Sequence, residues 1–382
     1  MTTTINNEHK KLNVPNLRFK EFQGEWEVES IKDVADFMGG GTPSSSNESF
    51  WQGTIPWVSS SDIVENDIKN ISISRYITEE AIAHSATKLC PAPSILIVSR
   101  VGVGKIALSK EAICTSQDFC NLINIKVEPI FLTYCLSQIM KRKSMEVQGT
   151  SIKGITTSEI QKISINIPSL REQKKIGKIL SLLDERIATQ NKIIDKLQSL
   201  IKGIRNDVFG KLRKNIGFNA VVGDVLDYEQ PQSYIVEDTE YTNEGTPVLT
   251  ANKAFVLGYT SETNGIYGKG DCIIFDDFTL DCKYVDFPFK VKSSAIKILT
   301  AKNKELLRYT FEFLKYLDLS AEEHKRHYIA ETQNQEIILP TEQMVKTIAH
   351  IFSTLSLRME TAVKQRNVFE KQKQYLLRQM FI

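Results

Sequence analysis

The sequence predicts an α+β protein in which two mixed domains are separated by an antiparallel pair of long coiled-coil helices, with a pseudo-two-fold internal repeat. Apolar residues recur every seven positions, in two columns, from residue 176 to residue 208, which is typical of a coiled-coil seam. The same spacing returns 172 residues later without a gap. Shorter matches in the stretches before the two helices recur at offsets that drift from 191 to 175. A repeat of this kind indicates a duplicated unit, domain then helix.

The first long helix is predicted over residues 169–210. Pro168 precedes it, Ser169 and Glu172 have the spacing of a capping box, and Gly210 suits its end. Only Gln190 interrupts the apolar columns. The seam residues predicted for this helix are Ile176, Leu180, Leu183, Ile187, Ile194, Leu197, Ile201 and Ile204.

The second long helix is predicted over residues 341–382, after Pro340, which repeats Pro168. Arg366 and Lys373 interrupt its second column, so the two helices are related but not interchangeable. Because a helix with a 3.5-residue apolar stripe must bury that stripe, we expect the two helices to pair. They run antiparallel if each domain caps one end of the pair. The seam residues predicted here are Ile348, Phe352, Leu355, Met359, Phe369 and Leu376.

Two mixed domains are predicted beside the helices. A lead-in of residues 1–22 precedes the first domain, residues 23–168, and the second domain spans residues 211–340. Hydrophobic patterning and turn residues predict the elements of the first domain. These are a short helix at 31–38, strands at 54–58 and 94–98, and a helix at 129–142.

Composition fits a globular protein with more than one core. The chain has 382 residues, of which 25% are charged and 41% hydrophobic. No apolar run approaches the length of a membrane span, and the polar N-terminus lacks a signal-peptide core. The six cysteines show no CxxC spacing. We expect reduced thiols in a cytoplasmic protein.

The net charge of +2 is unevenly distributed. Residues 169–216 carry 12 basic and 5 acidic side chains, and residues 342–382 carry 7 and 3. Residues 217–341 carry 12 basic and 20 acidic side chains. Basic helices favour an acidic partner such as DNA, but lysines and arginines also solvate the outer faces of coiled coils. Charge alone does not separate these readings.

A glycine-rich segment at residues 99–105 has two interpretations. It ends in Gly102-Val103-Gly104-Lys105, but Ser99 and Ile106 stand where a phosphate-binding loop needs glycine and a hydroxyl residue. A tight basic loop after a strand fits better. Its arginine and lysine could reach a phosphate or a guanine edge. An ordinary hairpin with solvated charges fits equally well.

Motifs for catalysis are weak. The segment from Asp276 to Lys283 resembles the carboxylate set of some metal nucleases but lacks a second cluster. His324 and His327 could form part of a zinc site, but no third ligand is near in sequence. The sequence has no Asn-Pro-Pro-Tyr methyltransferase motif, no cofactor-binding glycine motif and no complete ATP-binding loop. We expect a binder without a catalytic centre, a metal or a cofactor of its own.

The order of four segments, at residues 26–34, 53–58, 95–102 and 149–155, resembles the DNA-specificity subunit of Type I restriction–modification systems. The resemblance implies that each mixed domain is a target-recognition domain for one half of a split DNA sequence. It implies that the helices set the spacer and dock two methyltransferase (modification) subunits. S-adenosylmethionine, ATP and Mg are then expected in the partner subunits, including restriction subunits, and not in this chain.

Loop position and polarity predict the DNA-binding residues. In the first domain these are Ser59, Ser60, Ser61, Arg100, Lys105, Thr150, Ser151 and Lys153. In the second domain they are Thr250, Asn252, Lys253, Tyr267, Lys283, Lys325, Arg326 and Tyr328. Two alternatives stay open at this point: a bivalent protein-binding scaffold with no DNA role, and a nuclease that uses the Asp276–Lys283 cluster.

Overall fold

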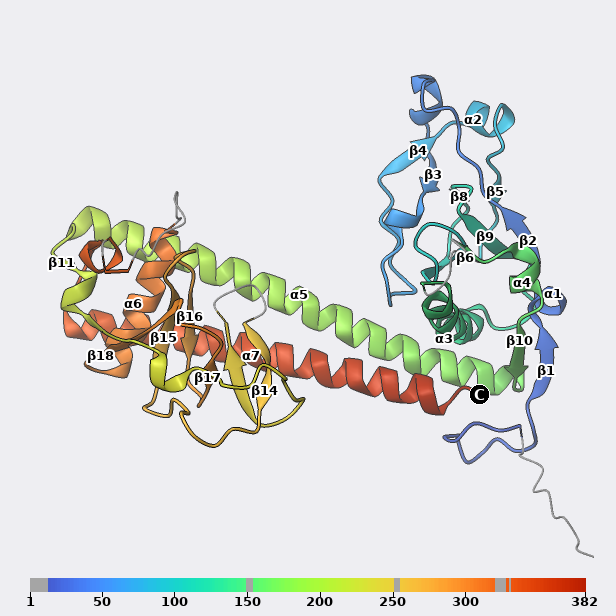
Figure 1. The fold of residues 1–382 in the computed structure, drawn as a ribbon. Helices are drawn as coiled ribbons and strands as arrows, with labels where there is room; N and C mark the ends of the chain where they lie inside the picture. The colour runs from blue at the N-terminus through green and yellow to red at the C-terminus, as the bar shows by residue number, and fades with distance from the viewer. Residues whose placement is uncertain (1–12, 149–153, 251–254, 320–327, 330) are drawn as a thin grey trace, which may run out of the picture. The chain divides into compact units, whose positions relative to one another are not determined.

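The chain forms two compact units in the computed structural model, which describes residues 13–148, 154–250, 255–319, 328–329 and 331–382. The first unit comprises residues 1–189 with 365–382, and the second comprises residues 190–364. Two long helices, α5 (Leu170–Asn215) and α7 (Glu342–Gln379), each contribute one end to each unit (Figure 1). No helix in the described part of the chain is both long and apolar enough to cross a membrane.

The first unit contains two four-stranded sheets, ordered β2-β9-β6-β7 and β4-β3-β8-β5. In the second of these sheets, β3 runs parallel to β8 and antiparallel to β4. Helix α3 packs against β6 and β7. The elements are β1 (Glu27–Ser30), α1 (Ile31–Val34), β2 (Asp36–Gly39), η1 (Glu48–Trp51), β3 (Ile55–Val58), η2 (Ser60–Asp62), β4 (Arg75–Ile77), α2 (Glu79–Ala83), β5 (Leu89–Cys90), β6 (Ser94–Val98), β7 (Ile106–Ser109), β8 (Ile113–Thr115), β9 (Phe119–Ile123), α3 (Pro129–Gln148), α4 (Thr157–Gln161) and β10 (Ser164–Ile167).

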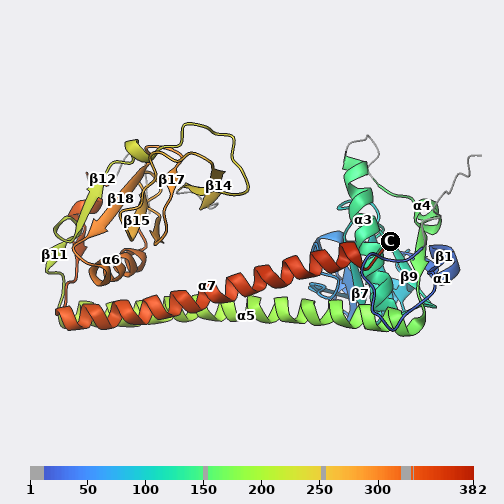
Figure 2. The ribbon, with the colours of Figure 1, turned by 90° about the horizontal axis from the view of Figure 1, so that it is seen from below.

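The second unit repeats this topology. Its sheets are ordered β12-β18-β15-β16 and β14-β13-β17, and β13 again runs parallel to one neighbour and antiparallel to the other. Helix α6 lies along the first of these sheets (Figure 2). The predicted duplication is therefore present in the fold. The elements are β11 (Ala220–Val221), η3 (Val222–Asp224), β12 (Leu226–Glu229), η4 (Gln232–Tyr234), β13 (Thr246–Leu249), β14 (Val256–Thr260), β15 (Cys272–Asp276), β16 (Cys282–Val285), β17 (Lys290–Val291), β18 (Ile296–Ala301), α6 (Lys304–Leu317), η5 (Thr332–Asn334) and β19 (Glu336–Ile337).

A short antiparallel ladder leads into each long helix. Strand β10 pairs with β1 before α5, and β19 pairs with β11 before α7. Each helix starts two residues beyond its proline, Pro168 or Pro340, because proline suits the residues just before a helix. The repeat is thus kept at the entry to both helices.

The predicted helix at 31–38 is wrong beyond Val34. Ala35 is extended, with φ −156° and ψ 156°, and the next residues form β2. Phe37 pairs with Leu122 of β9, so sheet pairing determines the local structure. The strands predicted at 54–58 and 94–98 are confirmed as β3 and β6, and the helix predicted from residue 129 is confirmed as α3.

Helix α5 continues five residues past Gly210, where the sequence predicted its end. Leu212 lies in the second unit's core with 5% of its surface exposed, so burial favours another helical turn. The helix ends before Gly217, which has a φ of +74°, and the Gly217 N–H donates to the Leu212 carbonyl at 3.4 Å. Gly217 therefore provides the left-handed C-terminal cap.

The two long helices pair along the predicted seam in both units. In the first unit, Ile176 and Leu180 near the start of α5 share a core with Leu376 near the end of α7. In the second unit, Ile201 near the end of α5 shares a core with Ile348 near the start of α7. The helices therefore run antiparallel. All 14 predicted seam side chains are buried or half-buried.

Candidate nucleic-acid interface

Residues 99–105 form the turn of the hairpin between β6 and β7. Two glycines make the turn possible, since Gly102 and Gly104 have φ values of +86° and +103°. The Val103 N–H donates to the Arg100 carbonyl at 3.1 Å, and Arg100 is exposed. The loop leads into a strand, whereas a phosphate-binding loop opens a helix. The loop is therefore a basic hairpin turn and lacks the geometry of a nucleotide-binding loop.

A serine-rich turn lies next to this hairpin. The Lys105 Nζ donates to the Ser60 carbonyl at 3.1 Å, which joins the two loops. The Asp62 carboxylate caps η2 by accepting the Ser59 N–H at 2.7 Å, and it also pairs with Arg75. The Ser59 hydroxyl is engaged in the same network. Ser61 is the most exposed of the three predicted serines.

A third predicted segment ends at the same place. The Ile155 N–H donates to the Ser99 carbonyl at 2.7 Å. A Cβ at Gly154 would come within 2.9 Å of the same carbonyl oxygen, so this close approach requires glycine. Thr150, Ser151 and Lys153 lie outside the described residues. The structure therefore brings together the loops at 59–61 and 99–105 and the C-terminal end of the 149–155 segment.

Two predicted contacts in the second unit are wrong. Tyr267 and Tyr328 are 1% and 0% exposed, so neither ring can reach DNA. Tyr267 stacks on Phe289 with ring centroids 4.9 Å apart, and Tyr328 packs edge-on against Phe275 at 5.4 Å. Both aromatic rings fill the core, and polarity in a loop sequence was a misleading signal for them.

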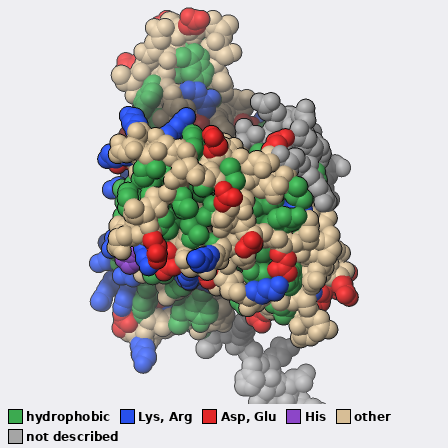
Figure 3. Space-filling model, turned by 90° about the vertical axis from the view of Figure 1, so that its left-hand side faces the viewer, with side chains coloured by type: hydrophobic (Ala, Val, Ile, Leu, Met, Phe, Trp, Pro, Cys, Tyr) green, Lys and Arg blue, Asp and Glu red, His purple; other side chains and the backbone are tan. Residues whose placement is uncertain are grey.

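The other predicted residues of the second unit are less informative. Thr250 is buried, and Lys283 is half-buried with its Nζ 3.1 Å from an Asp281 carboxylate oxygen. Asn252, Lys253, Lys325 and Arg326 lie outside the described residues. On the face that Figure 3 presents, acidic and basic side chains are interspersed with hydrophobic ones, so the acidic composition gives no uniformly acidic surface there.

The acidic segment at 276–283 has structural partners. Asp276 is 5% exposed, and its Oδ1 accepts the N–H groups of Phe278 and Thr279 at 2.8 and 2.9 Å. Burial raises the pKa of Asp281, but hydrogen bonds from lysines outweigh it and the net pKa is lowered. Among the described residues, no group of three or more His, Cys, Asp or Glu could hold a metal. The geometry does not support the nuclease reading, and His324 and His327 lie outside the described residues.

Sequence reasoning missed the cations that support the first interface. The Arg75 guanidinium lies over the Trp57 ring at 4.5 Å and pairs with Asp62. Lys69 donates to the Ser181 carbonyl of α5, and the Lys141 Nζ lies 3.5 Å from Asn66 Oδ1 in the loop after η2. A single arginine in a strand, such as Arg75, is not recognisable as functional from the sequence. Lys373 is recognisable as unusual, because it interrupts an apolar seam.

Comparison with protein families gives a match over most of the first unit and the first part of α5. Residues 23–199 match the family model described as Type I restriction modification DNA specificity domain. Nearly half of the chain is therefore similar to the DNA-specificity domain of Type I restriction–modification systems. The specificity subunit of the EcoR124I/EcoR124II enzymes from Escherichia coli is 46% identical over 126 residues, 31% of each chain. The MjaIX specificity subunit of Methanocaldococcus jannaschii is 28% identical over 308 residues, 74% of this chain and 67% of the relative.

A solved structure shares the fold of nearly the whole chain. The crystal structure of a Type I restriction–modification S subunit from M. genitalium superposes with a TM-score of 0.70 at 16% identity. It covers 97% of this chain and 99% of that one. The second unit, most of which lies beyond the family-model match, therefore shares its fold with that solved structure.

Proposed function

We propose that the chain is the DNA-specificity subunit of a Type I restriction–modification complex and binds double-stranded DNA. In this proposal each unit carries one target-recognition domain, and each domain reads one half of a split, asymmetric target. The observation that carries the proposal is the duplicated sheet topology of the two units. Two copies of one fold on a single chain supply two related reading surfaces.

The reading surface of the first domain is proposed at the converged loops around Arg100 and Ser61. An exposed arginine beside hydroxyl side chains suits both phosphate contacts, which fix register, and contacts to base edges, which specify sequence. The glycines of the hairpin keep its backbone narrow enough for close approach. Catalysis is assigned to partner subunits in the cytoplasm, which would use S-adenosylmethionine to methylate adenine, and ATP with Mg to translocate and cleave.

The helix pair is proposed to set the spacer and to dock two modification subunits. Support for docking comes from an apolar groove in the first unit, lined by both helices. Leu182 of α5 and Tyr375 of α7 are 47% and 57% exposed along it. Large apolar side chains that gather in a groove are typical of a protein–protein interface.

Selection from a random duplex library tests the proposal. The full chain with its modification subunit is expected to enrich a split sequence, with binding that weakens steeply as salt rises. A bivalent protein scaffold instead predicts no enriched sequence and no salt-dependent DNA binding. Metal-dependent cleavage of DNA by this chain alone would instead support the nuclease interpretation.

A further inference from the structure

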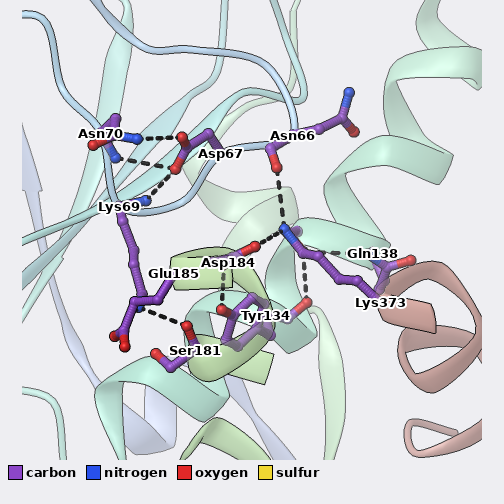
Figure 4. Close-up of polar contacts among 11 residues, drawn as sticks. Asn66, Asp67, Lys69, Asn70, Tyr134, Gln138, Ser181, Asp184, Glu185 and Lys373 are labelled. Carbon is purple, nitrogen blue, oxygen red and sulfur yellow. Dashed lines mark hydrogen bonds and ion pairs between the residues drawn. The ribbon is translucent and has the colours of Figure 1, made fainter. Parts of the chain in front are cut away.

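Lys373 of α7 lies in a buried polar network with three other parts of the first unit (Figure 4). Its Nζ is 2.5 Å from Asp184 Oδ1 on α5, and the two side chains are 9% and 11% exposed. The Tyr134 hydroxyl of α3 donates to the other carboxylate oxygen at 2.5 Å. Burial, and then the negative charge of Asp184, raise the pKa of Tyr134, so the hydroxyl stays protonated as a donor.

The same Nζ donates to the Asn66 carbonyl at 3.3 Å. Asn66 belongs to residues 63–71, which we call the clamped loop. Lys69 of this loop donates to the Ser181 carbonyl and to Glu185 of α5, both at 3.0 Å. The Lys141 Nζ lies 3.5 Å from Asn66 Oδ1. The loop is therefore fastened to α3, α5 and α7 by side-chain contacts.

The clamped loop connects directly to the proposed reading loop at 59–61. Ile63 and Ile71 form a β-bridge at its base. The Ser72 N–H donates to the Asp62 carbonyl at 2.9 Å, and Asp62 accepts the Ser59 N–H at 2.7 Å. A displacement of residues 63–71 would thus move Asp62, and with it the serines.

A cavity of about 200 Å³ lies between these parts. Asn66, Gly102, Lys105 and Lys373 are among the residues that line it. Ile68 of the clamped loop is 3% exposed in the first unit's core, and its carbonyl accepts the Leu108 N–H at 2.8 Å. Next to the cavity, polar contacts to the helices add to this packing, and Lys373 of α7 supplies the contact to the Asn66 carbonyl.

We propose that Lys373 is a positioning residue for the Ser59–Ser61 reading loop, so that the C-terminal helix affects which bases the first half-site accepts. This inference rests on the proposed DNA-specificity function. The second unit has no matching lysine, because the repeat puts Ile201 at that position. The counterpart of Asp184 is Ser356, which is engaged by Arg308 of α6. The effect is therefore confined to the first half-site.

Hydrogen exchange of the free protein tests positioning without DNA. Lys373→Met should speed amide exchange at Ser59 and Ser72 by about tenfold or more, as expected when a local contact is lost. Arg366→Met is the matched control, since Arg366 lies one heptad earlier and its side chain contacts Asn367 and Glu370 of its own helix. Lys373→Arg should restore slow exchange. Equal exchange in Lys373→Met and wild type overturns the proposal.

Library selection then tests specificity. Lys373→Met should broaden the sequence enriched at one half-site and leave the other unchanged, and Arg366→Met should alter neither. Equal loss at both half-sites, or at neither, overturns the effect on specificity. If wild type enriches no split sequence, the proposed function fails, while the exchange measurement still decides positioning. Should Lys373→Met fail to fold, Asp184→Asn with Lys373→Met removes both charges and keeps an acceptor for Tyr134.

Discussion

Arg205 of α5 donates from Nε and Nη2 to one carboxylate oxygen of Glu312 on α6, at 3.0 and 2.7 Å. Glu312 is 1% exposed, and its second oxygen accepts from Arg308 at 2.7 Å. One buried carboxylate thus joins the long helix to the helix that lies along the second unit's sheet. In the first unit, Tyr134 of α3 joins α5 through its hydrogen bond to Asp184.

Glu312→Leu should destabilise the second unit by about 3–5 kcal/mol, because it leaves two arginines without their buried partner. The free energy of unfolding in urea measures this loss. Lys211→Ala is the control. Its pair with Asp207 lies on α5 with both side chains more than half exposed, so a change of about 0.5 kcal/mol or less is expected. A similar small loss for Glu312→Leu would contradict the assigned role of the carboxylate.

Phe352→Ala should cost about 3–5 kcal/mol, since the ring is fully buried and stacks on Phe209 in the core between the helices. Leu357→Ala on the same helix is the control, because Leu357 is 63% exposed and its truncation should cost about 0.5 kcal/mol or less. Thermal unfolding followed by circular dichroism gives both values. Equal effects would mean that the seam does not hold the helices together.

Arg100→Ala should weaken DNA binding and reduce the slope of log K against log salt by about 0.9, the effect of one lost phosphate contact. If Arg100 instead contacts a base, affinity should fall for the preferred sequence, by about 1–3 kcal/mol, and the slope should stay the same. Lys110→Ala, an exposed lysine just beyond the end of β7, is the control. Wild-type binding by Arg100→Ala at every salt concentration would remove the hairpin from the interface.

Leu182→Glu with Tyr375→Glu should abolish docking of a modification subunit in the first unit, because two charges replace exposed apolar surface. Protein stability should change little. Leu200→Glu is the control, since Leu200 is 48% exposed on α5 outside the groove. Calorimetry with the purified modification subunit measures the affinity. Undiminished affinity in the double variant would place docking elsewhere.

The six cysteines should resist alkylation in the folded protein. All are buried and free, and burial raises the pKa of Cys90 to about 11 and that of Cys114 to about 12. Since the thiolate is the reactive form, thiols should react slowly at pH 8 and fast once the chain is unfolded. The folded state retains these protons more tightly, so stability should fall as pH rises above about 9. Rapid labelling at pH 8 without denaturant would contradict this burial.

The helix pair could be predicted because its signal is periodic and local, and the copied prolines fixed both starts. The end of α5 could not, since Gly210 and Gly217 are both plausible caps and only the burial of Leu212 selects between them. Tyr267 and Tyr328 were misread because a polar aromatic residue in a loop can face either water or the core. The role of Lys373 depends on Asp184 and Asn66, which only the fold brings near it.

The most direct test of a split-sequence reader is the map of methylated adenines in cells that carry, lack or alter this gene. The account predicts a two-part motif that disappears on deletion. Matched seven-residue insertions after Gln190 and its repeat counterpart Ala362 should lengthen the spacer and leave both half-sites unchanged. A single contiguous motif, or a spacer that stays the same after the insertions, would contradict the account.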